Sequence, residues 1–100
     1  MFVLFVIKIA LKLASIFEYG VISAFVEGGD NNLQRHDFLC NELKDLGYSP
    51  VNITGEWEGH KELSVLVPNI SMNDLITLGK KYNQDAVVYS CENKPQIINL

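Results

Sequence analysis

His36 and Cys40 are the two side chains whose types and spacing could support metal or nucleophilic chemistry. They stand four residues apart, so a helix would bring the imidazole and the thiol to one face. Two ligands do not make a metal site, and neither His60 nor Cys91 has a spacing that completes one. A nucleophilic thiol also needs a depressed pKa, for which this pair gives a weak signal. We therefore expect no metal, no cofactor and no catalytic set, and interpret the pair as a packed thiol beside a flanking histidine.

A second group of residues surrounds the single tryptophan, Trp57. Glu56, Glu58 and Glu62 flank it, in and next to a polar segment over residues 55–60 that predicts a hairpin connection. Paired carboxylates perform acid–base chemistry only inside a cleft that separates their pKa values, so a solvated charged face is the expected role. Trp57 either folds back onto the core or presents an anchor to a partner, and the sequence leaves both open.

The charge of the chain is unevenly distributed. The net charge is −4 over 100 residues, but residues 1–17 carry two lysines and no acid, and the remainder carries six basic and twelve acidic side chains. An acidic surface repels phosphate backbones, so we expect no nucleic-acid partner and keep a basic protein partner open. Two cysteines are too few for a disulfide scaffold; they indicate buried thiols in a reducing, cytoplasmic compartment, with one disulfide between them as the alternative.

The first 17 residues are strongly apolar. From Lys8 onward the lysines recur at helical spacing opposite an apolar face, which predicts an amphipathic helix over residues 1–19. A membrane span needs about 20 apolar residues, and this run is shorter and interrupted by two lysines. A membrane partner is therefore disfavoured, and we expect this helix to pack on the domain, with a surface-membrane helix as the alternative.

Residues 20–100 have the pattern of a single α+β domain. The segment 20–27 is apolar on both alternating sets, which predicts a central strand covered on both faces. Two helices are expected, the first capped by Asn31 with Gln34 and buried through Leu39, Leu43 and Leu46, and the second capped by Ser71. Further strands are expected at 48–54, 62–67, 85–91 and 96–100.

The order of these elements predicts a ferredoxin-like fold. Two β-α-β halves fit a β-α-β-β-α-β, mostly antiparallel sheet with the strands 20–27 and 62–67 as its inner pair. The N-terminal helix is then an addition that covers the face the other helices leave bare, and the last residues add a possible short C-terminal strand.

Six short motifs in a fixed order carry a family resemblance: Ile22-Ser23-Ala24, Asn32-x-x-Arg35, Leu39-x-x-x-Leu43 leading to Gly47-Tyr48, Gly55-x-Trp57, Glu62-x-Ser64-x-x-Val67, and Tyr82-x-Gln84-Asp85-Ala86-Val87-Val88-Tyr89. Over about residues 12–90 they resemble a family of small, functionally uncharacterised proteins of bacteria and their phages. The resemblance implies no activity, and this chain has Val26 where the family often has a basic residue. It singles out Arg35, Glu62 and Gln84 as candidate site residues.

These observations favour a non-enzymatic interaction protein over an enzyme. We expect a phage-encoded protein that binds a host protein through its acidic surface and the Trp57 hairpin. A small-ligand or nucleotide-processing domain, in which Arg35, Glu62 and Gln84 converge on a pocket, is the second hypothesis. A peripheral membrane protein acting through residues 1–17 is the third.

Overall fold

The computed structural model describes residues 18–57, 60–92 and 94–100. The helix expected over residues 1–19 lies outside this part of the chain except for Glu18 and Tyr19. These two residues begin the first strand instead of ending a helix.

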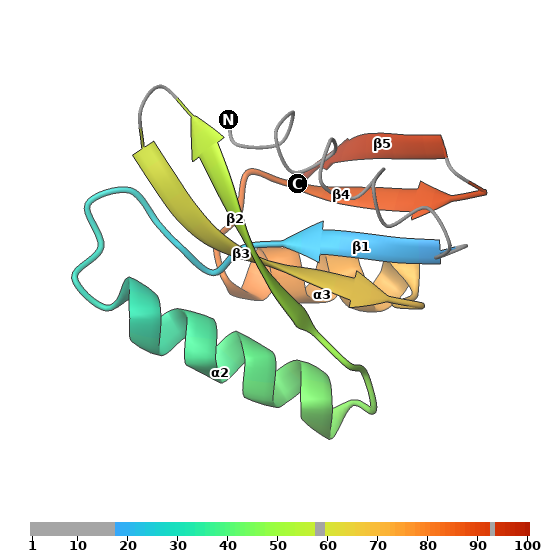
Figure 1. Cartoon of the computed structure of the whole chain (residues 1–100), viewed down its shortest axis with the longest axis horizontal. Helices are drawn as coiled ribbons and strands as arrows, with labels where there is room; N and C mark the ends of the chain where they lie inside the picture. The colour runs from blue at the N-terminus through green and yellow to red at the C-terminus, as the bar shows by residue number, and fades with distance from the viewer. Residues whose placement is uncertain (1–17, 58–59, 93) are drawn as a thin grey trace.

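Two helices and five strands make up the described chain (Figure 1). In chain order they are β1 (Glu18–Ile22), α2 (Asn32–Asp45), β2 (Val51–Trp57), β3 (His60–Pro68), α3 (Met72–Lys81), β4 (Ala86–Cys91) and β5 (Lys94–Asn99). The strands form one sheet in the order β2-β3-β1-β4-β5, and each neighbouring pair is antiparallel. The α+β class is confirmed, and β1 and β3 each pair on both sides, as the apolar segments 20–27 and 62–67 predicted.

One face of the sheet packs against both helices. Leu39 and Leu43 of α2 and Leu75 and Leu78 of α3 are buried in one cluster with alternate residues of the inner strands, namely Ile22, Val65, Val67, Val87 and Tyr89. Alternation along a strand sends every second side chain to the same face, so these residues form a continuous apolar layer under the helices. Burial of this layer is the main force that holds the helices to the sheet.

Gly20 allows β1 to lie close to α3. A Cβ atom at this position would stand 2.7 Å from Ile70 Cγ2 and 2.8 Å from Leu75 Cδ1, closer than side chains pack. Both neighbours are fully buried in the core and have little room to move. Gly20 is therefore needed at this position, because β1 and α3 lie too close together for a larger residue.

The opposite face of β1 is buried as well. Tyr19 and Val21 are 3% and 1% exposed, and Leu66 and Val88, which pair with Val21 on either side, are fully buried. This confirms that the central strand is covered on both faces. Three buried hydroxyls among the described residues, those of Tyr19, Ser64 and Ser90, have no hydrogen-bond partner.

The ends of α2 differ from the sequence prediction, whereas the start of α3 confirms it. Asn31 precedes α2 but its side chain makes no capping hydrogen bond, so the predicted capping box with Gln34 is wrong. Leu46, expected in the buried stripe, follows the helix and is 52% exposed. Gly47, which follows Leu46, has a positive φ of 93°, as is common for a glycine after the end of a helix. Ser71 caps α3 as expected, because its side chain accepts a hydrogen bond from the backbone N–H of Asp74 at 3.1 Å.

All five strands have other limits than predicted, and β1 and β2 differ most. β1 ends at Ile22 and not at residue 27, and the backbone that follows it is bound by the side chains of Asn32, Arg35 and Gln84. β2 begins at Val51 and continues to Trp57, and β3 begins at His60, so the predicted connection over residues 55–60 is wrong. Glu56 and Trp57 therefore belong to a strand, and Glu58 lies outside the described residues.

Candidate functional site

The segment Ser23–Val26, which follows β1, collects the polar side chains that the motifs contain. Asn32, the first residue of α2, fixes its end: the Val26 N–H donates to Asn32 Oδ1 at 2.9 Å, and Asn32 Nδ2 donates to the Val26 carbonyl at 3.0 Å. The side-chain amide thus pairs with both polar groups of one backbone residue. This pairing replaces the ladder that β1 would need to continue to residue 27.

Arg35 and Gln84 hold the same segment from the helix side. Arg35 Nε donates to the Ala24 carbonyl at 2.7 Å and Nη2 to the Tyr82 carbonyl at 2.6 Å. Gln84 Nε2 lies 3.0 Å from the carbonyls of both Phe25 and Tyr82. The two side chains therefore meet at the Tyr82 carbonyl. The Arg35 guanidinium also lies 5.6 Å from the centroid of the Tyr82 ring, within the range of a cation–π contact.

Glu62 reaches the start of the segment from β3. Ser23 Oγ donates to Glu62 Oε1 at 2.8 Å, and the Phe25 N–H donates to Ser23 Oγ at 3.0 Å. Burial raises the pKa of the Glu62 carboxyl, and the hydrogen bond from Ser23 opposes that shift. Ser23 is buried, and the Glu62 carboxylate supplies the partner that its hydroxyl needs.

The three residues singled out by the resemblance thus act on one segment. Arg35, Glu62 and Gln84 come from α2, β3 and the residues after α3, and all contact Ser23–Val26 or its neighbour Tyr82. Arg35 and Gln84 donate to backbone carbonyls and Glu62 accepts from Ser23, which makes all three positioning residues for the loop that leads into α2. They do not line the cavity described below.

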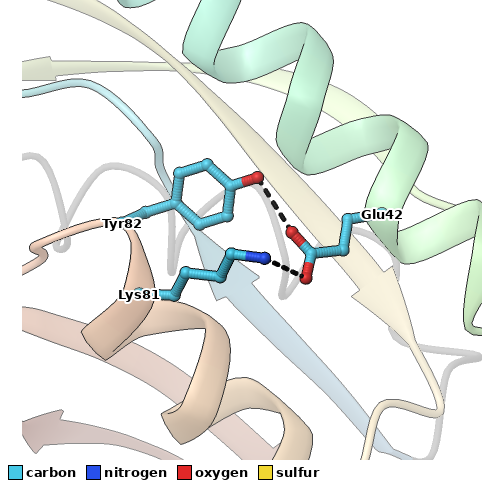
Figure 2. A network of polar contacts seen from close by, with 3 residues as sticks. All are labelled: Glu42, Lys81 and Tyr82. Carbon is cyan, nitrogen blue, oxygen red and sulfur yellow. Dashed lines mark hydrogen bonds and ion pairs between the residues drawn. The ribbon is translucent and has the colours of Figure 1, made fainter.

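Tyr82 and Lys81, at the end of α3, tie the two helices together (Figure 2). Lys81 Nζ lies 2.8 Å from Glu42 Oε2, and the Tyr82 hydroxyl donates to Glu42 Oε1 at 3.0 Å. Burial, together with the hydrogen bond to Glu42 and its negative charge, raises the pKa of Tyr82 to about 12. The phenol therefore stays protonated at neutral pH and keeps its donor for Glu42.

A cavity of about 350 Å³ lies beside α2 and the start of β2. Its lining is polar and comprises His36, Asp37, Cys40, Asn41, Lys44, Pro50 and Asn52. His36 Nε2 is 2.9 Å from Asn52 Oδ1 and 3.4 Å from Cys40 Sγ, and the sulfur is 3.7 Å from Asn52 Oδ1. The sequence indicated the His36–Cys40 pair, but nothing in its pattern connected Asn52 with them, because that contact is made between a helix and a strand.

Cys40 is a poor nucleophile in this setting. Burial raises the pKa of its thiol; the Lys44 charge opposes the shift and Asp37 adds to it. Both Cys40 and Cys91 are free, so the alternative of a disulfide between them is wrong. In the described part of the chain no group of three or more His, Cys, Asp or Glu side chains is placed to hold a metal ion.

The β2–β3 hairpin extends past the rest of the sheet. β1 pairs with β3 from Val65 to Pro68, whereas the pairing of β3 with β2 continues to His60 and Trp57 (Figure 1). We call the part that pairs only within the hairpin, Ile53–Trp57 with His60–Ser64, the β2–β3 arm. Glu56 lies opposite Lys61 in the arm, and Trp57 opposite His60 at its end.

The fold and these contacts define a small α+β domain with an extended hairpin and a side-chain-bound loop after its first strand. Residues 26–87 match the model of the family described as protein of unknown function (DUF3293), so the chain belongs to that family. The matched range contains Arg35, Glu62 and Gln84. No curated protein and no solved structure matches the chain.

Neither α2 nor α3 is long and apolar enough to cross a bilayer.

Proposed function

We propose that the protein is a non-enzymatic interaction protein that binds another protein through the β2–β3 arm. The single observation that carries the proposal is the strand register, in which the arm pairs only within itself beyond the Ile22–Val65 pair. Within the described part of the chain neither outer edge of the arm has a sheet neighbour, so the arm can reach a partner without disturbing the core. Trp57 ends β2 at the tip of this arm, and tryptophan is the residue type most enriched among binding hot spots.

The charge of the chain indicates the kind of partner. Residues 18–100 carry twelve acidic and six basic side chains, and Glu56 and Glu58 flank Trp57 in the sequence. An aromatic anchor between carboxylates complements a basic surface with an apolar recess. The resemblance to proteins of bacteria and their phages supports a bacterial cytoplasmic partner, the host's own if the chain is phage-encoded.

The small-ligand hypothesis has less support. It requires Arg35, Glu62 and Gln84 to face a common pocket, but Arg35 and Gln84 donate to backbone carbonyls and Glu62 accepts from Ser23. A guanidinium held by two carbonyls is not free to bind a phosphate or carboxylate.

The strand order supports the finer assignment of the fold. The order β2-β3-β1-β4, with a helix after β1 and another after β3, is the arrangement of the ferredoxin-like fold, and β5 extends it beyond β4. We infer that the family shares this core and that function is located in what projects from it.

Site-specific photocrosslinking tests the proposal. A photoreactive phenylalanine analogue at position 57 should capture a defined bacterial protein, and the same analogue at Ile97 of β5 should not. With the purified partner, W57A should weaken binding by about tenfold or more, because loss of a buried aromatic anchor exceeds about 1.4 kcal/mol. V51A, an exposed change on the same strand but outside the arm, serves as the matched control. Equal affinity of W57A and wild type would refute the assignment of the arm.

A further inference from the structure

Three donor atoms of different chemistry converge at the cavity beside α2. They are His36 Nε2, Cys40 Sγ and Asn52 Oδ1, with separations of 2.9, 3.4 and 3.7 Å. His36 and Cys40 are one helical turn apart and face the same side of α2, and Asn52 approaches from β2. Imidazole nitrogen, thiolate sulfur and amide oxygen are each ligands of divalent metals in proteins.

We propose that His36, Cys40 and Asn52 bind a divalent zinc-class ion whose fourth position opens into the cavity. A tetrahedral ion with bonds of about 2.0–2.1 Å to nitrogen or oxygen and about 2.3 Å to sulfur separates its ligands by about 3.3–3.7 Å. The two distances to sulfur lie in or beside this range. The nitrogen–oxygen distance of 2.9 Å is that of a hydrogen bond and opens by about half an ångström when an ion replaces the shared proton.

The surrounding elements hold the three ligands in place. His36 is 3% exposed, so packing fixes its ring, and Cys40 is half-buried on the same helix. Asn52 is paired with Val65 of the inner strand β3, which fixes its backbone against the sheet. The volume of about 350 Å³ next to these atoms leaves room for a water molecule or a small anion at the fourth position.

Binding displaces two protons from their present positions. The Cys40 S–H bond breaks as the sulfur–metal bond forms, and its proton passes to the solvent. The imidazole binds through Nε2 with its own proton on Nδ1, an atom that has no hydrogen-bond partner in the described part of the chain. Of the charged groups that line the cavity, Asp37 attracts the ion and Lys44 repels it. The unpartnered Nδ1 proton and the Lys44 charge both weaken binding, so we expect moderate and not very tight affinity.

Cobalt titration of the reduced full-length protein tests the proposal. Co²⁺ should produce a thiolate-to-cobalt charge-transfer absorption in the near ultraviolet that saturates at one equivalent, and Zn²⁺ should abolish it. C40S should lose the absorption, whereas C91S, which removes the other free thiol, should keep it. In spectra that correlate imidazole protons with ring nitrogens, Zn²⁺ should shift the His36 Nε2 resonance.

Asn52→Asp provides a gain-of-function test that does not depend on the loss of a ligand. A carboxylate in place of the amide adds a negative ligand at an exposed position and should tighten Co²⁺ binding by about tenfold. Circular dichroism checks that each variant is folded. The proposal is overturned if wild type gives no charge-transfer absorption, if C91S and not C40S loses it, or if N52D binds Co²⁺ no more tightly than wild type.

Discussion

Arg35 donates hydrogen bonds to carbonyls that lie 11 and 47 residues away along the chain. Its planar guanidinium joins the loop after β1 to the end of α3, and Gln84 reinforces the same junction through the Tyr82 carbonyl. Hydrogen bonds from a charged donor to buried carbonyls are among the stronger ones in proteins. At the scale of single residues, the polar groups of Arg35 and Gln84 are therefore used to hold the loop after β1 and are not free to bind a ligand.

Removal of the Arg35 fork should destabilise the domain measurably. R35A should lower the free energy of unfolding by about 2–3 kcal/mol, because the carbonyl of the fully buried Ala24 loses its donor. R35K should restore only part of this loss. One ammonium can donate to a carbonyl, but it cannot reproduce the planar fork of the guanidinium. Urea denaturation measures both variants, and K80A, an exposed change near the end of α3, is the control. Equal stability of R35A and wild type would show that the fork is dispensable.

Glu62 should make the stability of the domain depend on pH. Burial raises the pKa of its carboxyl in the folded state, so the folded state binds this proton more tightly than the unfolded chain does. The associated stability is present below the ordinary pKa of 4.5 and is lost as pH rises through the raised value. E62Q, which cannot ionise, should therefore be more stable than wild type at pH 7, and the difference should shrink as pH falls below 4.5.

Chemical denaturation of wild type and E62Q across this pH range is the measurement. S23A is the companion variant, because it removes the hydrogen bond that opposes the shift. In an S23A background, E62Q should therefore stabilise the domain at neutral pH by more than it does in wild type. A difference between E62Q and wild type that stays constant with pH would contradict the raised pKa.

At the scale of elements, the close contact of β1 with α3 sets the geometry of the core. The contact depends on Gly20, whose missing side chain leaves room for Ile70 and Leu75. The arm, at the other end of the sheet, pairs with no third strand among the described residues. Its link to the rest of the domain includes the hydrogen bonds that Ser23 Oγ donates to Glu62 Oε1 and to the Leu63 carbonyl.

G20A should test the tight centre. The added methyl would overlap Ile70 and Leu75 and should cost about 1–3 kcal/mol of unfolding free energy. In an L75V background, which removes volume from the same place, G20A should cost less than in wild type. A double-mutant cycle from thermal or urea unfolding measures this coupling. Strictly additive effects would mean that strand and helix do not meet at Gly20.

At the scale of the whole molecule, residues 18–100 carry twelve acidic and six basic side chains. On the proposed function, this excess would raise the encounter rate with a basic partner through long-range attraction. The described cavity is small and polar. It lies beside α2 and the start of β2, whereas Trp57 lies at the other end of β2, where it pairs with His60. Protein binding and ion binding are thus predicted at separate places.

Association with the protein partner should weaken with salt. Raising sodium chloride from about 50 mM to about 500 mM should slow association by about tenfold, because the screening length falls below the distance over which the charges act. The E56Q/E58Q double variant should show a shallower dependence, and surface plasmon resonance measures both. A rate that does not change with salt would exclude electrostatic steering and the basic partner with it.

Much of the fold could be predicted because its signals are local. The apolar pattern of segment 20–27 and the Ser71 cap each depend on a few neighbouring residues; the central strand is buried on both faces, and Ser71 caps α3. Strand ends were predicted less well. β1 stops at Ile22 because side chains from distant elements bind the following backbone, which no local pattern expresses.

The candidate site could be predicted only in part. Arg35, Glu62 and Gln84 were named together through the resemblance, and the structure brings them to one loop, yet their role as backbone partners was not foreseen. Asn52 was missed as a neighbour of His36 and Cys40. The placement of Glu56 and Trp57 in a loop was wrong, since β2 extends to Trp57.

The sequence by itself determined the element order, the apolar central strand and the acidic balance, because periodicity and charge are properties of neighbouring residues and of composition. Only the tertiary structure decided which polar side chains meet. Hydrogen bonds and ligand sets join residues that are far apart along the chain, and their partners are chosen by the packing of helices against the sheet.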